Sequence, residues 1–296
     1  MGFLDRLKFG LRLAARSLGV VRANPVLLVF PVASAVFVAL FGVVALASVF
    51  ALGGLGAVFG GVERALGPLG YQAALAAYFF VVSVLATFFN AALVHESAAA
   101  MRGEAPSVRG GLAAAWGVIG RILVWGVVSS TVGLVLHNLE RDRRVGPLVT
   151  ALLGASWGIL TYFVVPVLVF ERTGLRETLT RSGGVLRETW GEGIGFGAGI
   201  SVAFVALAAV WLVAFVAALV VVPGVLVVPV VVVAFLALGA LAAARSAAVA
   251  VAKTALYLYA TGEEPPGFEG IDFRNGPRTP ANSPGVGGVG GRGGNI

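Results

Sequence analysis

The stretch VVPVLVFERTGLRETLTRSGGVLRETWG, residues 164–191, shows how the chain is threaded. Its first part is almost uninterrupted apolar sequence and predicts a helix that ends at Phe170. A charged elbow follows at Glu171 and Arg172. The remainder places leucines at helical spacing between charged residues, which predicts an amphipathic helix up to Trp190. The simplest interpretation is a cytoplasmic interfacial helix that joins two membrane spans.

Three side chains of this stretch are candidates for a functional role. Glu177 precedes Arg181 by four residues, the favourable orientation for an ion pair along a helix. Trp190 suits a membrane interface, where its ring lies in the acyl boundary and its N–H stays hydrated. The alternative to a simple interfacial helix is therefore a docking surface or a gate built on Glu171, Arg181 and Trp190.

The composition indicates a membrane protein. Of the 296 residues, 58% are hydrophobic and 12% are charged, and the mean hydropathy is +0.96. A soluble domain carries about 25% charged residues, so this chain has too little polar surface to cover a globule in water. Apolar runs of span length recur along the chain, which favours several transmembrane helices.

The reactive residues exclude several kinds of site. The chain has no cysteine, so it has no disulfides and no thiolate metal sites, and its two histidines make a histidine metal site unexpected. We expect no cofactor. The net charge is +7. We expect the positively charged residues to lie at helix ends, where they face anionic headgroups. Nucleic-acid binding is not expected, because the basic residues form no patch interleaved with aromatic residues.

The pattern divides the chain into three parts. Residues 1–24 place leucines on one helical face and Lys8, Arg12 and Arg16 on another, which predicts an interfacial amphipathic helix. Residues 25–262 are predicted to form an all-α, polytopic domain of six transmembrane helices. The predicted spans are 26–51, 71–94, 122–136, 148–170, 194–222 and 225–244. Residues 245–262 continue as a helix along the membrane surface, and the Gly/Pro-rich tail 263–296 is predicted to be disordered.

The third span leaves two alternatives because it begins beside Arg121. In the first, residues 108–120 lie in the interface, the chain bends at Gly120, and Arg121 reaches the headgroups. In the second, the whole stretch is one tilted helix, and Arg121 faces a polar cavity in a functional role. We favour the first alternative, because an arginine at the bilayer centre costs about 2.5–3.5 kcal/mol.

The distribution of cations predicts the orientation. With six spans, 17 of the 21 Lys and Arg residues fall on the side that holds both termini. The positive-inside rule assigns that side to the cytoplasm. The sequence therefore predicts a multi-pass protein of the cell membrane with cytoplasmic N- and C-termini.

Several motifs occur in a characteristic order. They are SLGVVRANPVLLVFP (17–31), RGEAPSVRGGLA (102–113), PVLVFE (166–171), LRETLTRS (175–182), LRETWGE (186–192) and ALYLYATGEEPPGF (255–268). In this order the chain resembles an uncharacterised family of six-helix prokaryotic membrane proteins that is common in archaea. The resemblance covers most of residues 10–270 and implies a topology and a location, but no activity.

A looser likeness rests on two shorter patterns. P-x4-E at 166–171 and R-S-x3-L-x3-W at 181–190 are similar to the membrane domain of some glycerophosphodiester phosphodiesterases. That domain is not the catalytic part of those enzymes, so no catalytic residue carries over.

These observations favour a non-catalytic function. The predicted spans contain no Asp, Glu or Lys, and an enzyme needs such groups to converge. The polar residues within them are expected to form hydrogen bonds between helices; they are Gln72, Asn90, Ser129, Ser130 and Thr131. We expect a membrane assembly or scaffold component that contacts anionic lipids and assembles as a homo-oligomer or with another membrane protein. The alternative is a transporter or channel for a small solute or lipid.

Overall fold

The computed structural model describes residues 3–51, 53–54, 60–61, 64, 67–141, 146–171 and 174–268. These residues form helices and turns, and no strand occurs among them, which confirms the predicted all-α class. The α-helices are α1 (Phe3–Ala23), α2 (Val29–Ala51), α4 (Gly70–Met101), α5 (Val108–Gly117), α6 (Ile119–Arg141), α7 (Pro147–Leu160), α8 (Val164–Phe170), α9 (Leu175–Val221) and α10 (Val227–Ala260). Short 3-10 helices at Pro25–Leu28, Gly67–Leu69 and Gly224–Leu226 lead into α2, α4 and α10.

Five helical segments are long and apolar enough to cross a membrane. They are Pro25–Ala51, Gly70–Met101, Ile119–Arg141, Pro147–Phe170 and Gly224–Ala260. The predicted span 194–222 lies within α9, where the described apolar run Phe204–Leu219 is shorter, and the side chains of 185–203 are outside the described residues. The fold is that of a polytopic membrane protein, and the sixth span stays a prediction.

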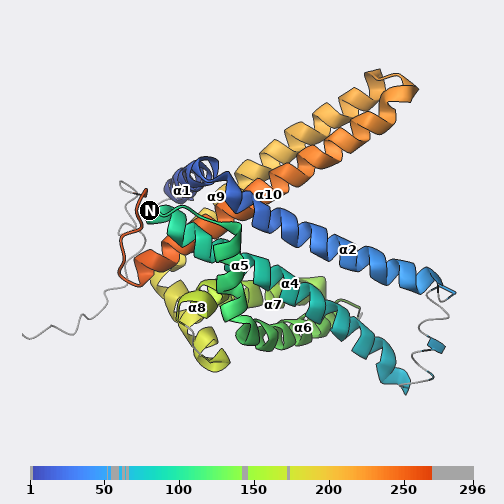
Figure 1. Cartoon of the computed structure of the whole chain (residues 1–296), viewed down its shortest axis with the longest axis horizontal. Helices are drawn as coiled ribbons and strands as arrows, with labels where there is room; N and C mark the ends of the chain where they lie inside the picture. The colour runs from blue at the N-terminus through green and yellow to red at the C-terminus, as the bar shows by residue number, and fades with distance from the viewer. Residues whose placement is uncertain are drawn as a thin grey trace, which may run out of the picture.

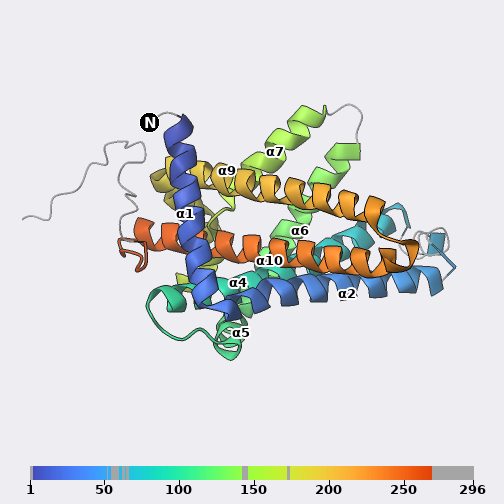
Figure 2. The ribbon, with the colours of Figure 1, turned by 90° about the horizontal axis from the view of Figure 1, so that it is seen from above.

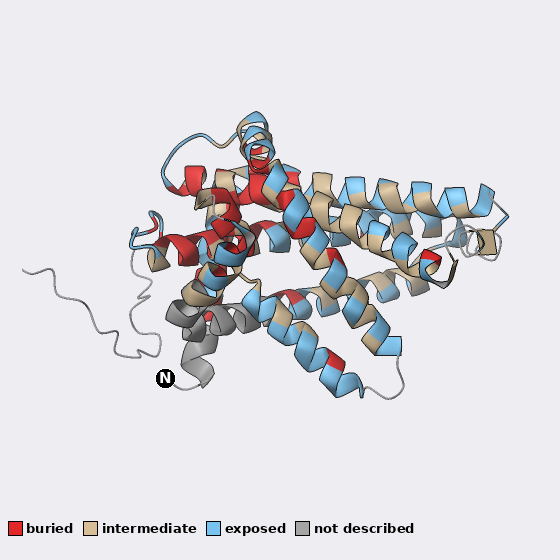
Figure 3. Ribbon diagram, turned by 90° about the horizontal axis from the view of Figure 1, so that it is seen from below, coloured by how far each residue is buried: buried red, intermediate tan, exposed pale blue. Residues whose placement is uncertain are grey.

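The long helices meet at one end of the molecule, which we call the base. Figure 2 shows α1 lying across α9 and α10 at this end, while α2, α9 and α10 extend away from it. Buried residues are concentrated at the base, and the opposite ends of the helices are largely exposed (Figure 3). The α9–α10 hairpin diverges from α2 as it leaves the base (Figure 1). A hydrophobic core therefore closes only one end of the bundle.

The helix α1 packs on the base through one stripe. Leu13, Ala14, Ser17 and Val21 are buried at helical spacing, and they face α9 and α10. Leu11, which the amphipathic pattern also placed on the apolar face, is exposed. The predicted N-terminal helix is present, and its contact with the membrane surface stays a prediction.

The last helix corrects the sequence-based division at residue 244. The α10 helix continues without a break to Ala260, and its second half enters the core of the base. Val251, Ala255 and Leu256 are fully buried, so this part does not run along a membrane surface as predicted. Its many alanines allow close approach of neighbouring helices, which the hydropathy pattern alone does not distinguish from a surface helix.

The α9 helix corrects the predicted separation between an interfacial helix and the fifth span. It has 47 residues without interruption, a length of about 70 Å. The glycines near residue 190 do not end it, because glycine weakens a helix but keeps the N–H that a proline lacks. The hydrocarbon core of a bilayer is only about 30 Å thick, so part of α9 must extend beyond it.

The predicted end of the second span at residue 94 is also too early. The α4 helix continues to Met101, and Glu96 lies in the core with 3% of its surface exposed. Its carboxylate accepts a 2.6 Å hydrogen bond from the backbone N–H of Ser107, the N-cap of α5. The same carboxylate lies 3.3 Å from Nδ1 of His95. Glu96 therefore fixes the start of α5.

The chain bends between α5 and α6, which agrees with the bend of the first alternative for the third span, while the contact of Arg121 with headgroups stays a prediction. The helix breaks at Val118 rather than at Gly120, and α6 begins at Ile119. Arg121 thus lies in the first turn of α6 and not in the middle of a continuous helix.

The first residues of the predicted tail pack on the base. Arg102 forms a 3.0 Å ion pair with Glu263, and Phe268 is 1% exposed within the core. Gly262 and Gly267 have positive φ angles and allow the chain to turn back there. Residues 269–296 are outside the described residues, so the predicted disorder of the tail stays a prediction.

Candidate functional site

The predicted span 148–170, whose last residues open the stretch 164–191, is interrupted by a break. Helices α7 and α8 are separated by a turn at Thr161–Phe163, where the sequence predicted one continuous helix. Pro166 explains the break, because proline has no N–H to donate to the carbonyl four residues earlier and its ring clashes with that carbonyl. Non-helical backbone within a membrane span needs hydrogen-bond partners from elsewhere in the protein.

Ser182 supplies those partners. Its hydroxyl donates a 2.8 Å hydrogen bond to the carbonyl oxygen of Leu160 and accepts one of 3.2 Å from the N–H of Phe163. Ser182 is fully buried on α9. A single side chain of α9 therefore satisfies a backbone donor and a backbone acceptor on the two sides of the break.

The other end of α8 is held by a carboxylate. Glu171 follows α8 directly, and its Oε1 accepts hydrogen bonds from Nε of Arg181 at 2.9 Å and from the hydroxyl of Tyr257 at 2.8 Å. The ring of Tyr257 also stacks on Phe170, with centroids 5.4 Å apart. The structure thus brings the candidates Glu171 and Arg181 together and adds Tyr257 of α10 to them.

A lysine lies beside the break itself. Nζ of Lys253 on α10 is 4.2 Å from the centroid of the Tyr162 ring, a distance typical of a cation–π contact. The hydroxyl of Tyr162 is buried, and the structure gives it no hydrogen-bond partner. Lys253 precedes Tyr257 by four residues, so both lie on the same face of α10.

We call these two groups together the α8 clamp: Glu171, Arg181 and Tyr257 at one end of α8, and Tyr162, Ser182 and Lys253 at the other. The clamp ties the ends of the seven-residue helix α8 to α9 and α10. Across the residues that the structure describes, no group of three His, Asp or Glu residues could hold a metal ion. The arrangement is suited to positioning a broken span.

The carboxylate end of the clamp should show measurable coupling. Tyr257→Phe removes one hydrogen bond to Glu171, and we expect it to lower the free energy of unfolding by about 1–2 kcal/mol, because a hydrogen bond to a charged group is stronger than a neutral one. A double-mutant cycle of Tyr257→Phe with Glu171→Gln, followed by thermal or denaturant unfolding in detergent, measures the coupling. Additive effects of the two changes would contradict the direct contact. Thr261→Ala is the control, because its hydroxyl bonds only to the backbone of α10.

Two other predicted site residues lie outside the clamp. Nη1 of Arg121 is buried without a hydrogen-bond partner, and among the described side chains Arg121 forms no ion pair. Trp190 lies in the α9 backbone, but its side chain is outside the described residues. Of the three residues in the docking or gate hypothesis, Glu171 and Arg181 are in contact. A docking or gating role for them stays a prediction.

The predicted hydrogen bonds between helices are correct in one case. Gln72 on α4 exchanges two side-chain hydrogen bonds with Asn138 on α6, at 3.2 and 3.4 Å. The prediction is wrong for Ser130 and Thr131, whose hydroxyls both donate to the carbonyl of Val127 in their own helix. Short hydroxyl side chains often bond back within their helix in this way.

The comparison with known families identifies the chain. A family described as a family of unknown function, DUF6159, matches residues 69–267. The chain belongs to the DUF6159 family. No curated protein and no solved structure matches it. The match confirms membership of an uncharacterised family, and it includes both ends of the α8 clamp.

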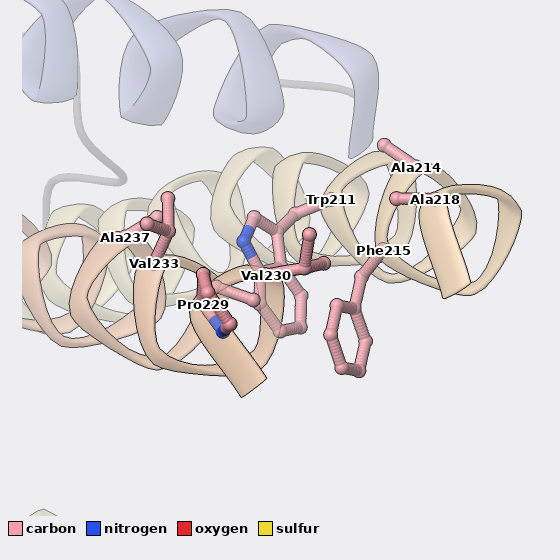
Figure 4. Close-up of a pocket in the computed structure, with 9 residues that line it drawn as sticks. Trp211, Ala214, Phe215, Ala218, Pro229, Val230, Val233 and Ala237 are labelled. Atoms are coloured by element: carbon pink, nitrogen blue, oxygen red, sulfur yellow. The ribbon is translucent and has the colours of Figure 1, made fainter. Parts of the chain in front are cut away.

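Two of the hollows among the described residues bear on function. The larger one lies between α2, α4 and α5, has a volume of about 910 Å³, and carries Arg109 and Trp116 at its rim. The smaller one, of about 340 Å³, lies between α9 and α10 and is lined by apolar side chains that include Trp211, Phe215 and Pro229 (Figure 4). Of these two hollows, the larger one combines an apolar wall with a charged side chain, Arg109.

Sequence reasoning missed four members of the clamp. Ser182 lies within the predicted interfacial helix but was not a site candidate, Tyr162 lies in a span that was predicted to be continuous, and Tyr257 and Lys253 were placed on a surface helix. The proline at position 166 was a usable signal for the break, because it lies within an apolar run of span length. Nothing in the local sequence pairs Lys253 with a tyrosine ninety-one residues earlier.

Proposed function

We propose that this DUF6159 protein is a non-catalytic membrane protein that acts by assembling with lipids or with other membrane proteins. One observation carries the proposal: the helices are packed at the base and leave large apolar surfaces beyond it. Val213, Val221 and Val225 are 70%, 82% and 82% exposed on the α9–α10 hairpin. Lipid covers such surfaces in a membrane, and a partner helix can replace that lipid.

The first test is the mass of the intact particle. The tagged full-length protein would be purified from native membranes in a mild detergent, and the particle mass would be measured. A homo-oligomer or a stoichiometric membrane-protein companion supports the proposal. A monomer that retains neither a companion nor any lipid counts against it.

We further propose that the protein lies in the cell membrane with both termini in the cytoplasm. The supporting observations are the cation distribution and the helix order, in which Glu104 lies near the base and Gly146 precedes α7 at the far end of α6.

We also propose that the protein belongs to an archaeal-type group and is related to the membrane domain of some glycerophosphodiester phosphodiesterases. The motifs at 166–192 support both proposals.

The cysteine-free chain allows a direct topology experiment. We expect a membrane-impermeant maleimide to label Gly146→Cys in intact cells and Glu104→Cys only after permeabilisation, because the two positions lie on opposite sides of the predicted membrane. Both positions are exposed, so access to the side chain does not limit labelling. Labelling of Glu104→Cys in intact cells would reverse the proposed orientation.

A transporter or channel is the second candidate, and the broken span favours it. Transporters often place their sites at discontinuous helices, and Lys253 brings a charge next to such a break within a segment of span character. Liposome flux assays over a panel of small solutes test this function. Transport that is lost in Lys253→Met or Arg121→Leu would replace the assembly proposal.

A further inference from the structure

The larger hollow has the form of a site for a membrane lipid. It opens between the first turns of α2 and the second half of α4, and α5 forms its remaining wall. Its volume of about 910 Å³ is at the upper end of the range of about 300–1,000 Å³ for small-molecule sites. We call it the α5 groove.

Aromatic rings form much of the wall of the α5 groove. The ring of Phe89 stacks on Phe37 with centroids 5.5 Å apart. Phe88 meets Phe89 edge to face at 5.5 Å and Trp116 at 6.5 Å. These contacts join α2, α4 and α5 around one apolar space. Such a wall suits an acyl chain and offers nothing to a polar solute.

The charge at the rim of the groove is a single cation. Arg109 lies in the first turn of α5, is exposed, and forms no ion pair with any side chain in the described part of the chain. Glu96 is the acidic residue next to this turn, but it is buried and its carboxylate is bonded to Ser107. Arg109 is therefore the group that a ligand in the groove meets where the apolar wall ends.

We infer that the α5 groove binds one anionic glycerophospholipid. An acyl chain lies against Phe37, Phe88 and Phe89, and the headgroup phosphate accepts hydrogen bonds from Arg109. Trp116 is 68% exposed beside the groove, a placement that suits the boundary between headgroups and acyl chains. Arg109 selects an anionic headgroup, and the aromatic wall accepts the acyl chain. The bound lipid therefore differs from the lipid that covers the rest of the bundle. The inference holds whether the protein assembles with partners or transports a solute.

Native mass spectrometry of the full-length protein tests the inference. The protein would be reconstituted with equimolar phosphatidylglycerol and phosphatidylcholine and released into detergent. We expect the wild type to retain phosphatidylglycerol in preference to phosphatidylcholine. Arg109→Gln should lower that preference about fivefold, the factor for one cation at an anionic surface. Arg176→Gln is the matched control, because Arg176 is also exposed but lies on α9.

Filling the groove separates a defined site from surface lipid. Ala33→Phe places a ring among the groove residues, whereas Ala35→Phe places the same ring on an exposed face of α2. We expect Ala33→Phe to remove the retained lipid and Ala35→Phe to keep it. Thermal unfolding of both variants checks that they are folded. Equal lipid ratios in the wild type and in Arg109→Gln would overturn the inference. So would a dimer that only Ala33→Phe dissociates, because the occupant would then be a second copy of the chain.

Discussion

Replacing Ser182 with alanine should destabilise the protein by about 2–4 kcal/mol, because each buried backbone group left without a partner costs about 1–3 kcal/mol. The change removes the acceptor of the Phe163 N–H and the donor to the Leu160 carbonyl in one step. Water cannot replace the hydroxyl, since Ser182 is fully buried. Unfolding of the purified protein in detergent, followed by far-UV circular dichroism, measures the loss.

Thr180→Ala provides the control for this prediction. Thr180 lies on the same helix, is exposed, and donates its hydroxyl to the carbonyl of Arg176 one turn earlier. Its removal leaves no buried group unpaired, and exposed substitutions of this kind change stability by less than about 0.5 kcal/mol. If both variants had the same stability as the wild type, Ser182 would not support the break.

The break and its support show what a sequence pattern specifies and what it does not. Pro166 is a local signal from which the break could have been predicted, because a proline disrupts its own helix, although the span was predicted to be continuous. The residue that repairs the discontinuity comes from α9, and no local pattern distinguishes Ser182 from Thr180. A proline thus marks where a helical span can break, and the packing of another helix determines whether the broken backbone finds hydrogen-bond partners.

The difference between a local pattern and packing by other helices also explains why residues 245–262 were wrongly predicted to lie along the membrane surface. Hydropathy falls after residue 244 because Arg245, Lys253 and Thr254 interrupt the apolar run, and such a fall usually marks a membrane boundary. In the structure Thr254 donates to the carbonyl of Ala250 within α10, and Lys253 lies over an aromatic ring. Both polar side chains therefore enter the base with partners that a hydropathy scale does not count.

The candidate site was predictable in part. Glu171 follows α8 directly and Arg181 lies ten residues later on α9, and both were candidates from the sequence; their side chains meet in the structure. Tyr257 joins them from eighty-six residues away, and such a contact follows only from the arrangement of α9 and α10. The polytopic class follows from apolar runs of span length that recur along the chain, which is why it was predictable when the individual helix ends were not.

The second large effect is expected at the wall of the α5 groove, where Gly111→Ala should destabilise the protein by about 1–3 kcal/mol through overpacking. A Cβ atom at Gly111 would lie 2.6 Å from Cζ of Phe30 and 2.9 Å from Cγ of Glu96. Phe30 is 1% exposed and Glu96 is fixed by its bond to Ser107, so the added methyl group must displace at least one of two packed side chains. Unfolding in detergent measures the loss of stability.

Gly117→Ala makes the same chemical change at the other end of α5 and should have the opposite sign. No atom lies within 4 Å of a Cβ built at Gly117, and alanine is favoured over glycine in a helix by about 0.5–1 kcal/mol. The contrast isolates contact from helix propensity, because both substitutions stiffen the same helix. If Gly111→Ala also displaces α5, it should lower the retained phosphatidylglycerol as Ala33→Phe does, while Gly117→Ala should leave it unchanged. A Gly111→Ala variant as stable as Gly117→Ala would mean that α5 does not approach Phe30 and Glu96 as closely as the groove requires.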